Sequence, residues 1–298
     1  MAMLFPLLAV LIWAANVIVS KAAANVLDPA AISIYRWLVA ALVLTPFCLP
    51  TVRRRARELK PWLGKFLALS ALGMVMFQCL AYYAAHSTSA TNMGVITAMV
   101  PLLGLLLNAA VFRQKVSAPA WLGVAVSLSG VVYLLGKGDP LGLLSNGINI
   151  GDGLILAGAA SYALYGILLR RWAPPFGSWV NLYLQASLAV LLLLPLTLTA
   201  RSMAIPAEGA GLVLFAGIGS SLFAAYLWMH GIQKLGSDRT AIFMNLLPLF
   251  TALMASAMLG ETIHHYHWVG GGLILLGVAM GQGVLRLRPA RREAFVNK

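Results

Sequence analysis

Apolar runs of about 20 residues recur along the whole chain, and each is long enough to cross the hydrocarbon core of a bilayer. The sequence is 61% hydrophobic and 10% charged, whereas a soluble domain has roughly 25% charged residues. Continuous apolar runs favour helices, because spanning strands would give short segments of alternating polarity. We therefore expect an all-α polytopic membrane protein.

Ten transmembrane helices are predicted from these runs. Their expected ranges are 3–24, 29–50, 62–86, 88–112, 119–136, 151–169, 178–200, 209–234, 239–259 and 268–287. The first run resembles a signal peptide in length, but it has no basic leader and belongs to the repeat described next, so we expect it to be retained. The loops between the runs are too short to hold a soluble domain.

The chain contains an internal duplication, because residues 98–131 recur without a gap at 245–278. Three landmarks repeat at a constant offset of 147 positions: Pro101 and Pro248, Trp121 and Trp268, and Gly123 and Gly270. Five spans per half place the halves in opposite orientations, so we expect two inverted five-helix repeats, residues 1–140 and 141–298, around a central cavity. Inverted repeats are typical of secondary transporters, whose site lies between the repeats near the midplane. The alternative is a duplicated helical scaffold without a pathway.

The basic residues indicate the orientation of the chain, because cytoplasmic loops are enriched in Lys and Arg. With the N-terminus inside, the inner segments hold 17 of the 21 Lys and Arg residues, and the outer segments hold three. We expect a bacterial-type inner-membrane protein with both termini cytoplasmic. The net charge of +13 does not indicate nucleic acid, since the basic residues lie between the spans.

Several features together resemble the EamA family of the drug/metabolite transporter superfamily. They are the two five-helix halves, the motif LGETIHHYHWVGGGLILLGV after a proline-containing span, and Trp13 followed by Lys21. The resemblance covers essentially the whole chain and is nearest to the YddG-type amino-acid exporters. It implies a basket of helices one to four and six to nine around a cavity, with helices five and ten outside. One departure is that Gln114 stands where the second half has Glu261.

Polar side chains inside the spans are the candidates for function. Stripes of such residues on spans one, three, six, eight and nine are expected to line the cavity: Trp13, Asn16, Gln78, Tyr82, His86, Tyr162, Tyr165, Tyr226, His230, Met244 and Asn245. One stripe alone also suits helix packing, but several stripes in cavity-lining spans favour a pathway. Pro101 and Pro248 each remove a backbone hydrogen bond, which predicts either a tolerated kink or a paired hinge or gate.

Arg36 lies inside span two, about 9 Å below its outer end at the rise of an α-helix. It could hold a substrate carboxylate, but the sequence favours a structural role, in which it snorkels outward or bonds backbone carbonyls. His264, His265 and His267 follow span nine; an exposed polar loop is a better interpretation than a metal site, since no cysteine or second histidine cluster accompanies them.

All eight carboxylates lie in loops or at span ends. A pump for lipophilic cations would be expected to carry one in mid-span, whereas aromatic and amide groups suit a small, near-neutral or zwitterionic solute. We predict an alternating-access exporter of amino acids, including aromatic or neutral ones, or of similar small metabolites, without cofactor or metal. The alternatives are a multidrug exporter of lipophilic solutes and an integral-membrane enzyme, although the sequence has no metal-ligand set, paired mid-span carboxylates or nucleophile motif.

Two further expectations concern coupling and assembly. His86 and His230 are the only histidines near the expected cavity, and without a mid-span carboxylate we expect facilitated diffusion rather than proton coupling. Gly277 and Gly281 form a small-xxx-small pair, which indicates helix packing and only weakly dimerisation. We therefore expect a monomer in the bilayer, with a dimer as the alternative.

Overall fold

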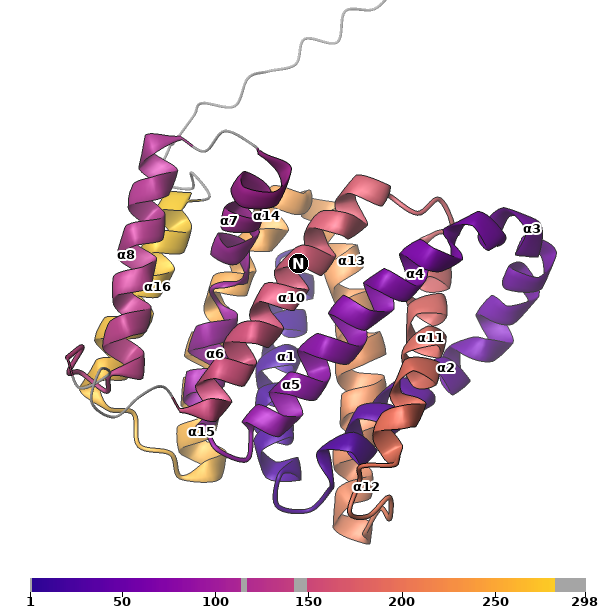
Figure 1. The fold of residues 1–298 in the computed structure, drawn as a ribbon, viewed down its shortest axis with the longest axis horizontal. Helices are drawn as coiled ribbons and strands as arrows, with labels where there is room; N and C mark the ends of the chain where they lie inside the picture. The colour runs from indigo at the N-terminus through magenta and orange to yellow at the C-terminus, as the bar shows by residue number, and fades with distance from the viewer. Residues whose placement is uncertain (1, 114–116, 142–148, 282–298) are drawn as a thin grey trace, which may run out of the picture.

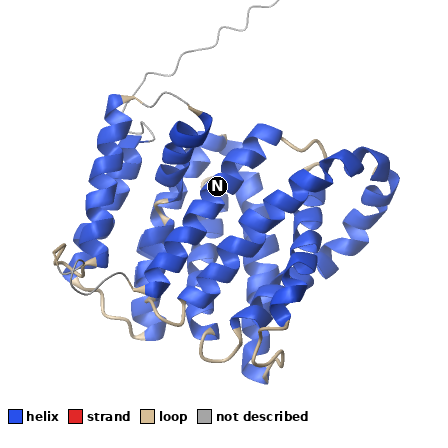
Figure 2. Cartoon of the chain, in the orientation of Figure 1, coloured by secondary structure: helices blue, strands red, loops and turns tan. Residues whose placement is uncertain are grey.

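The structure, a computed structural model, describes residues 2–113, 117–141 and 149–281. These residues form helices joined by short loops, with no strand among them (Figure 2). The helices run alongside one another through the molecule (Figure 1). The prediction of an all-helical protein is confirmed.

Eight helical segments of the described chain are long and apolar enough to cross a bilayer. Five of them are uninterrupted: α1 (Leu4–Ala23), α2 (Pro29–Arg54), α8 (Ala118–Leu135), α10 (Ile150–Trp172) and α11 (Ser178–Thr197). The other three are Ala56–Ala84, Ala207–Leu235 and Arg239–Leu259, each made of several consecutive elements.

The composite segments change their helical geometry along their length. The first contains α3 (Ala56–Leu59), η1 (Lys60–Trp62), α4 (Leu63–Leu69), the π-helical η2 (Ser70–Met76) and α5 (Phe77–Ala84). The second contains α12 (Ala207–Leu214), the π-helical η3 (Phe215–Phe223) and α13 (Ala224–Leu235). The third contains α14 (Ser237–Ile242), the 3₁₀ turn η4 (Phe243–Leu246) and α15 (Leu247–Leu259).

Two further predicted spans are found only in part among the described helices. Helices α6 (Ala90–Thr97) and α7 (Val100–Phe112) form a pair bent by 42°, which gives a ninth crossing if the pair is one span. Helix α16 (His265–Gly281) has 17 described residues, and the predicted span continues to Leu287, outside the described residues. The count of ten therefore stays a prediction.

Local chemistry explains where several helices begin and end. Asp28, Ser89 and Asn149 each accept a hydrogen bond from a backbone N–H of the following turn, which caps α2, α6 and α10. Gly260 ends α15 with a φ of 68°, a left-handed conformation that glycine adopts without strain. Helix α2 runs to Arg54, beyond the predicted end at Pro50, since prolines are tolerated inside membrane helices.

Helices α8 and α16 lie side by side at one edge of the molecule (Figure 1). A Cβ atom added to Gly123 would lie 2.5 Å from the carbonyl oxygen of Gly277, and one added to Gly130 would lie 2.7 Å from that of Gly270. The residue order reverses between the helices, so they pack antiparallel. Gly277 thus serves packing within the chain, as predicted.

Helices of the first half pack mainly against helices of the second. Helix α2 packs on α11, α5 on α10, α6 on α15, and α1 on both α13 and α15. Fully buried alanines lie where these helices meet, and small side chains let backbones approach closely: Ala9, Ala14, Ala40, Ala186 and Ala189.

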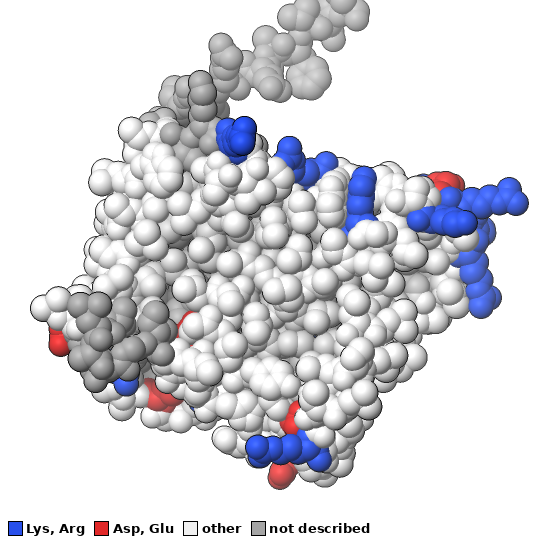
Figure 3. Space-filling model, in the orientation of Figure 1, with Lys and Arg blue, Asp and Glu red and all other residues white. Residues whose placement is uncertain are grey.

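The charged side chains divide between two edges of the molecule. Most visible Lys and Arg gather along one edge, over the ends of α7 and α10 and over α3. Most visible Asp and Glu lie toward the opposite edge, together with a smaller group of Lys and Arg (Figure 3). Between these edges the visible surface carries almost no charge, as the surface that faces lipid requires.

Candidate functional site

Two π-helical segments, η2 and η3, lie in the middle of the composite segments Ala56–Ala84 and Ala207–Leu235. A π-helical turn shifts the backbone hydrogen bonds by one residue and frequently marks a functional site. The stretch SALGM holds one serine and one glycine, and GIGSS holds two of each. This composition is not distinctive, so nothing in the sequence indicated the two segments.

Side chains of other helices bind backbone carbonyls within these segments. The indole of Trp37 donates to the carbonyl of Met74 in η2 at 3.0 Å, and the hydroxyl of Ser161 donates to that of Leu72 at 2.7 Å. In η3, the indole of Trp13 donates to the carbonyl of Ser220 at 3.2 Å. The irregular backbone is thus supported by fixed side-chain contacts.

Arg36 of α2 lies between the π-helical segment η3 and helix α5 and is only 3% exposed. Its guanidinium donates to the hydroxyls of Ser221 at 2.9 Å, Ser220 at 3.1 Å and Tyr82 at 3.2 Å, and to the amide oxygen of Gln78 at 2.8 Å. We call these five residues the Arg36 cluster. Among the described residues its hydrogen-bond partners are side chains and not backbone carbonyls, and its burial excludes snorkelling, so neither contact expected from the sequence is formed.

The Arg36 cluster joins the two halves of the chain. Gln78 and Tyr82 belong to α5 in the first half, and the two serines belong to η3 in the second half. Gln78 and Tyr82 had been predicted as cavity residues, and their spacing of one helical turn brings both to the same guanidinium.

Aromatic side chains adjoin the cluster. Tyr162 stacks on Tyr165, with 5.2 Å between ring centroids, and lies 4.7 Å from Phe77, the neighbour of Gln78 in the chain. Trp13, which binds the Ser220 carbonyl, packs against Trp228 with 5.2 Å between centroids. Trp13 thus contacts the backbone of a cluster residue, and Tyr162 and Tyr165 pack beside the helix that carries Gln78 and Tyr82.

Tyr226 and His230 form a separate aromatic group on α13. Their ring centroids lie 4.1 Å apart. Phe5 of α1 lies 5.7 Å from the His230 ring, and Trp179 of α11 lies 6.1 Å from the Tyr226 ring, again between centroids. The Tyr226 side chain is exposed, unlike the Arg36 cluster. The structure does not bring these two predicted residues to the Arg36 cluster.

The remaining candidates lie apart from the cluster. His86 is exposed beyond the end of α5, whereas Asn16 is buried with its Oδ1 atom unpartnered among the described residues. Met244 and Asn245 are half-buried in η4. The predicted hinges occupy equivalent places, each as the second residue of a helix after an interrupted segment: Pro101 in α7 and Pro248 in α15.

A glutamate of the second half caps a helix of the first half. The Glu261 carboxylate accepts hydrogen bonds from the backbone N–H of Ala90 at 2.7 Å and from the N–H and hydroxyl of Thr91 at 3.1 and 2.8 Å. These groups begin α6, and a helix N-terminus favours a negative charge. The sequence had shown Glu261 in a loop but not the helix that it caps.

A second carboxylate reaches the same end of α6. Asp152 of α10 is 5% exposed and accepts hydrogen bonds from the Thr88 hydroxyl and, at 3.2 Å, from the Asn92 amide. Lys21 donates to the carbonyls of Ala85 and Thr88 at 2.7 and 2.8 Å, at the end of α5. Burial of Asp152 was not predicted, because its position at the start of a span suggested exposure.

Two cavities lie outside the Arg36 cluster. One, of about 330 Å³, is lined by α7, α10 and α16, and includes Tyr162 and Arg170. The other, of about 410 Å³, is lined by Asp152, Glu261 and His267 among others.

His267 is buried, and its Nδ1 accepts a hydrogen bond from the backbone N–H of His264. The prediction that this histidine lies in an exposed loop was therefore wrong. In the described ranges no cluster of three or more His, Cys, Asp or Glu side chains is placed to hold a metal.

Comparison with known families identifies the class of the protein. The EamA-like transporter family matches residues 1–136 and, again, residues 149–280. The chain therefore belongs to the EamA-like transporter family and is a multi-pass membrane transporter.

Relatives from distant organisms cover nearly the full chain. "Uncharacterized transporter YyaM" of Bacillus subtilis is 26% identical, over 87% of this chain and 86% of its own length. An "Uncharacterized transporter" of Archaeoglobus fulgidus is 27% identical, over 91% and 93%. "Uncharacterized inner membrane transporter YedA" of Escherichia coli K12 is 23% identical, over 91% and 87%. One crystal structure shares the fold with a TM-score of 0.63 and 19% identity, over 96% of this chain and 99% of the other.

Proposed function

We propose that the protein exports amino acids, including aromatic or neutral ones, or similar small metabolites, by alternating access of two inverted five-helix halves. The halves are residues 1–140 and 141–298, and the solute binds between them. The observation that carries the proposal is the buried Arg36 cluster, because its donors and acceptors come from both halves. A site shared by two halves changes when one half moves against the other.

The contacts of α8 and α16 support the inverted repeat. The offset of 147 residues relates Gly123 to Gly270 and Gly130 to Gly277. Applied to the contact between Gly123 and Gly277, it yields the contact between Gly270 and Gly130, which also occurs. A two-fold relation between antiparallel helices has this property. The two separate family matches, one in each half, point the same way.

The interrupted helices support movement between the halves. Pro101 and Pro248 both follow a break, and a proline at that place cannot complete the hydrogen bonds of a straight helix. We propose that these breaks act as paired hinges or gates. The π-helical segments η2 and η3 occupy corresponding helices and lie beside the proposed solute site.

The chemistry of the proposed site favours amino acids over lipophilic cations. In the described part of the spans, no carboxylate is hydrogen-bonded to the Arg36 guanidinium, whose four acceptors are neutral. The stacked rings of Tyr162 and Tyr165 offer faces for an aromatic side chain or an ammonium group. A multidrug exporter and a membrane enzyme are the alternatives, and the relatives are named as transporters.

We propose an inner-membrane location with the basic edge in the cytoplasm. The Escherichia coli relative is named an inner membrane transporter, and most visible Lys and Arg gather at one edge of the molecule (Figure 3). The positive-inside rule assigns that edge to the cytoplasm, which places both termini inside.

Flux measurements in liposomes test the proposal. The purified protein would be reconstituted and supplied with a panel of labelled amino acids, with protein-free liposomes as the baseline. We expect several amino acids to cross unmodified, and Tyr165→Ala to lower the flux. Leu128→Ala, on the exposed face of α8, is the control and should match the wild type. Flux of no amino acid above the baseline, or a chemical product in place of the solute, would refute the proposal.

A further inference from the structure

We propose that Arg36 binds the carboxylate of the transported solute, so that the protein selects solutes carrying this group. The inference rests on the proposed function and deepens it, because it names the chemical feature that is recognised. The sequence alone favoured a structural role for Arg36. Three properties of the Arg36 cluster argue for a ligand instead: its lack of an anionic partner among the described residues, its unused donors and its exchangeable acceptors.

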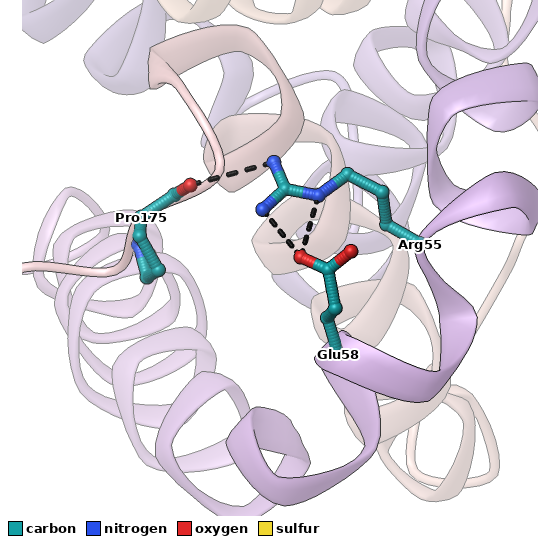
Figure 4. A network of polar contacts seen from close by, with 3 residues as sticks. All are labelled: Arg55, Glu58 and Pro175. Atoms are coloured by element: carbon teal, nitrogen blue, oxygen red, sulfur yellow. Dashed lines mark hydrogen bonds and ion pairs between the residues drawn. The ribbon is translucent and has the colours of Figure 1, made fainter.

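The charge of Arg36 has no counter-charge in the described protein. The only ion pair among the described residues joins Arg55 to Glu58, at 2.6 Å on the surface, where Arg55 also reaches the Pro175 carbonyl (Figure 4). Arg36 is buried, and its four acceptors are neutral. Charges buried in proteins are normally paired, because removal from water is costly. An anion is therefore the partner that this site lacks.

The Arg36 cluster also has more donors than acceptors. A guanidinium has five N–H groups, and four of them are used within the cluster. The hydroxyls of Tyr82 and Ser220 accept from Arg36, while their own protons have no acceptor among the described residues, and the same holds for the Gln78 amide N–H groups. A carboxylate offers about four lone-pair sites and no donor. It matches the unused donors of the cluster.

The present acceptors of Arg36 can be replaced by a carboxylate. Gln78 and Tyr82 bind the guanidinium through an amide and a hydroxyl, both of which can rotate. Bonds between a guanidinium and a carboxylate are roughly twice as strong as those to neutral acceptors and are often bidentate. The Tyr82 hydroxyl can then donate to the same carboxylate. A purely structural arginine would gain nothing from such exchangeable partners.

Access to Arg36 requires movement of the halves, because the guanidinium is buried in this conformation. Gln78 and Tyr82 lie on α5, and Ser220 and Ser221 lie on η3, so separation of these elements opens the cluster. The Arg36 cluster is thus closed while α5 and η3 lie together, and it is divided when the halves part. Binding of a carboxylate to both sets of donors would couple solute occupancy to closure.

The test compares an amino acid with its amide, in which an uncharged carboxamide replaces the carboxylate. Labelled phenylalanine and phenylalaninamide would be supplied to liposomes holding the wild type, R36Q, R36K or Y82F. For the wild type we expect a preference for phenylalanine of about tenfold or more, the range of one hydrogen bond to a charged group. R36Q should lose most phenylalanine flux and the preference for phenylalanine. R36K should keep part of both, because lysine retains the positive charge but not the planar, paired donors of a guanidinium.

Two controls keep the outcomes distinct. R201Q removes an exposed loop arginine and should keep the wild-type preference. Size-exclusion profiles and melting temperatures show whether R36Q folds. If R36Q does not fold, the preference of the wild type and that of Y82F test the inference. Y82F keeps the aromatic ring but removes one hydrogen-bond donor, so it should lower the preference for phenylalanine several-fold.

The results separate the inference from the proposed function. Equal wild-type flux of phenylalanine and its amide, or an unchanged preference in folded R36Q, would overturn the role of Arg36 and leave amino-acid export standing. Absence of wild-type flux for every amino acid of the panel would overturn the proposed function, and the inference with it.

Discussion

Replacement of Gly277 by alanine tests the tightest helix contact of the protein directly. The added Cβ would lie 2.5 Å from the backbone nitrogen of Ser127 and 2.6 Å from its Cβ, and closer still to the carbonyl oxygen of Gly123. All three atoms are held by helix α8 and cannot rotate away. The only relief is separation of α8 from α16.

The size of the expected loss of stability follows from these distances. Carbon atoms in contact prefer a separation of about 3.5–4.0 Å, so the helices must move apart by roughly 1 Å. Overpacking of this kind costs about 1–3 kcal/mol. Gly272→Ala in the same helix is the matched control, because nothing lies within 4 Å of its added Cβ. That change should be neutral or slightly stabilising, since alanine favours the helix over glycine.

A thermal unfolding assay in detergent measures the difference in stability between the two variants. Cys48 and Cys79 are buried, so a thiol-reactive dye reports their exposure as the protein unfolds. We expect Gly277→Ala to lower the Tm by roughly 2–6 °C and Gly272→Ala to leave it unchanged or raised. Gly130, its counterpart in the first half, should behave like Gly277. Equal Tm values for the Gly277 and Gly272 variants would refute the close contact, and unequal effects at Gly130 and Gly277 would weaken the two-fold relation.

Three further predictions concern orientation, the α6 cap and energy coupling. In a background without native cysteines, a cysteine at Arg55 should be shielded from an impermeant thiol reagent in intact cells and one at His264 should react; the reverse pattern would invert the assigned orientation. Glu261→Ala removes three hydrogen bonds at the start of α6 and should lower stability by about 0.5–2 kcal/mol, with faster amide hydrogen exchange at Ala90 and Thr91; unchanged exchange there would contradict the cap. Liposomes at equal pH should take up solute only to equilibrium, and a pH gradient should add nothing; accumulation that a protonophore abolishes would show proton coupling instead.

The sequence by itself determined the class of protein and most of the helices. A bilayer requires each span to be long, apolar and internally hydrogen-bonded, so the evidence for a span lies within one segment of about 20 residues. The main errors in these ranges occurred where a local signal was ambiguous. Pro50 was taken as the end of a span, yet α2 continues to Arg54.

The repeat was also readable from the sequence, because a duplication leaves matching residues at a constant offset. Gly123 and Gly130 were visible as repeated positions, and Gly277 was predicted to serve packing. Which helix it packs against was not visible, since the contact joins residues more than 140 positions apart.

Tertiary structure alone decided the composition of the candidate site. Helical spacing placed Gln78 and Tyr82 on one face of their span, but the buried arginine that binds them comes from another helix, and the serines beside it come from the other half. The π-helical segments shift hydrogen bonds without a distinctive sequence pattern. His86 and Tyr226 fitted the same helical stripes and lie elsewhere. A periodic pattern specifies one face of a helix, and only packing determines what that face meets.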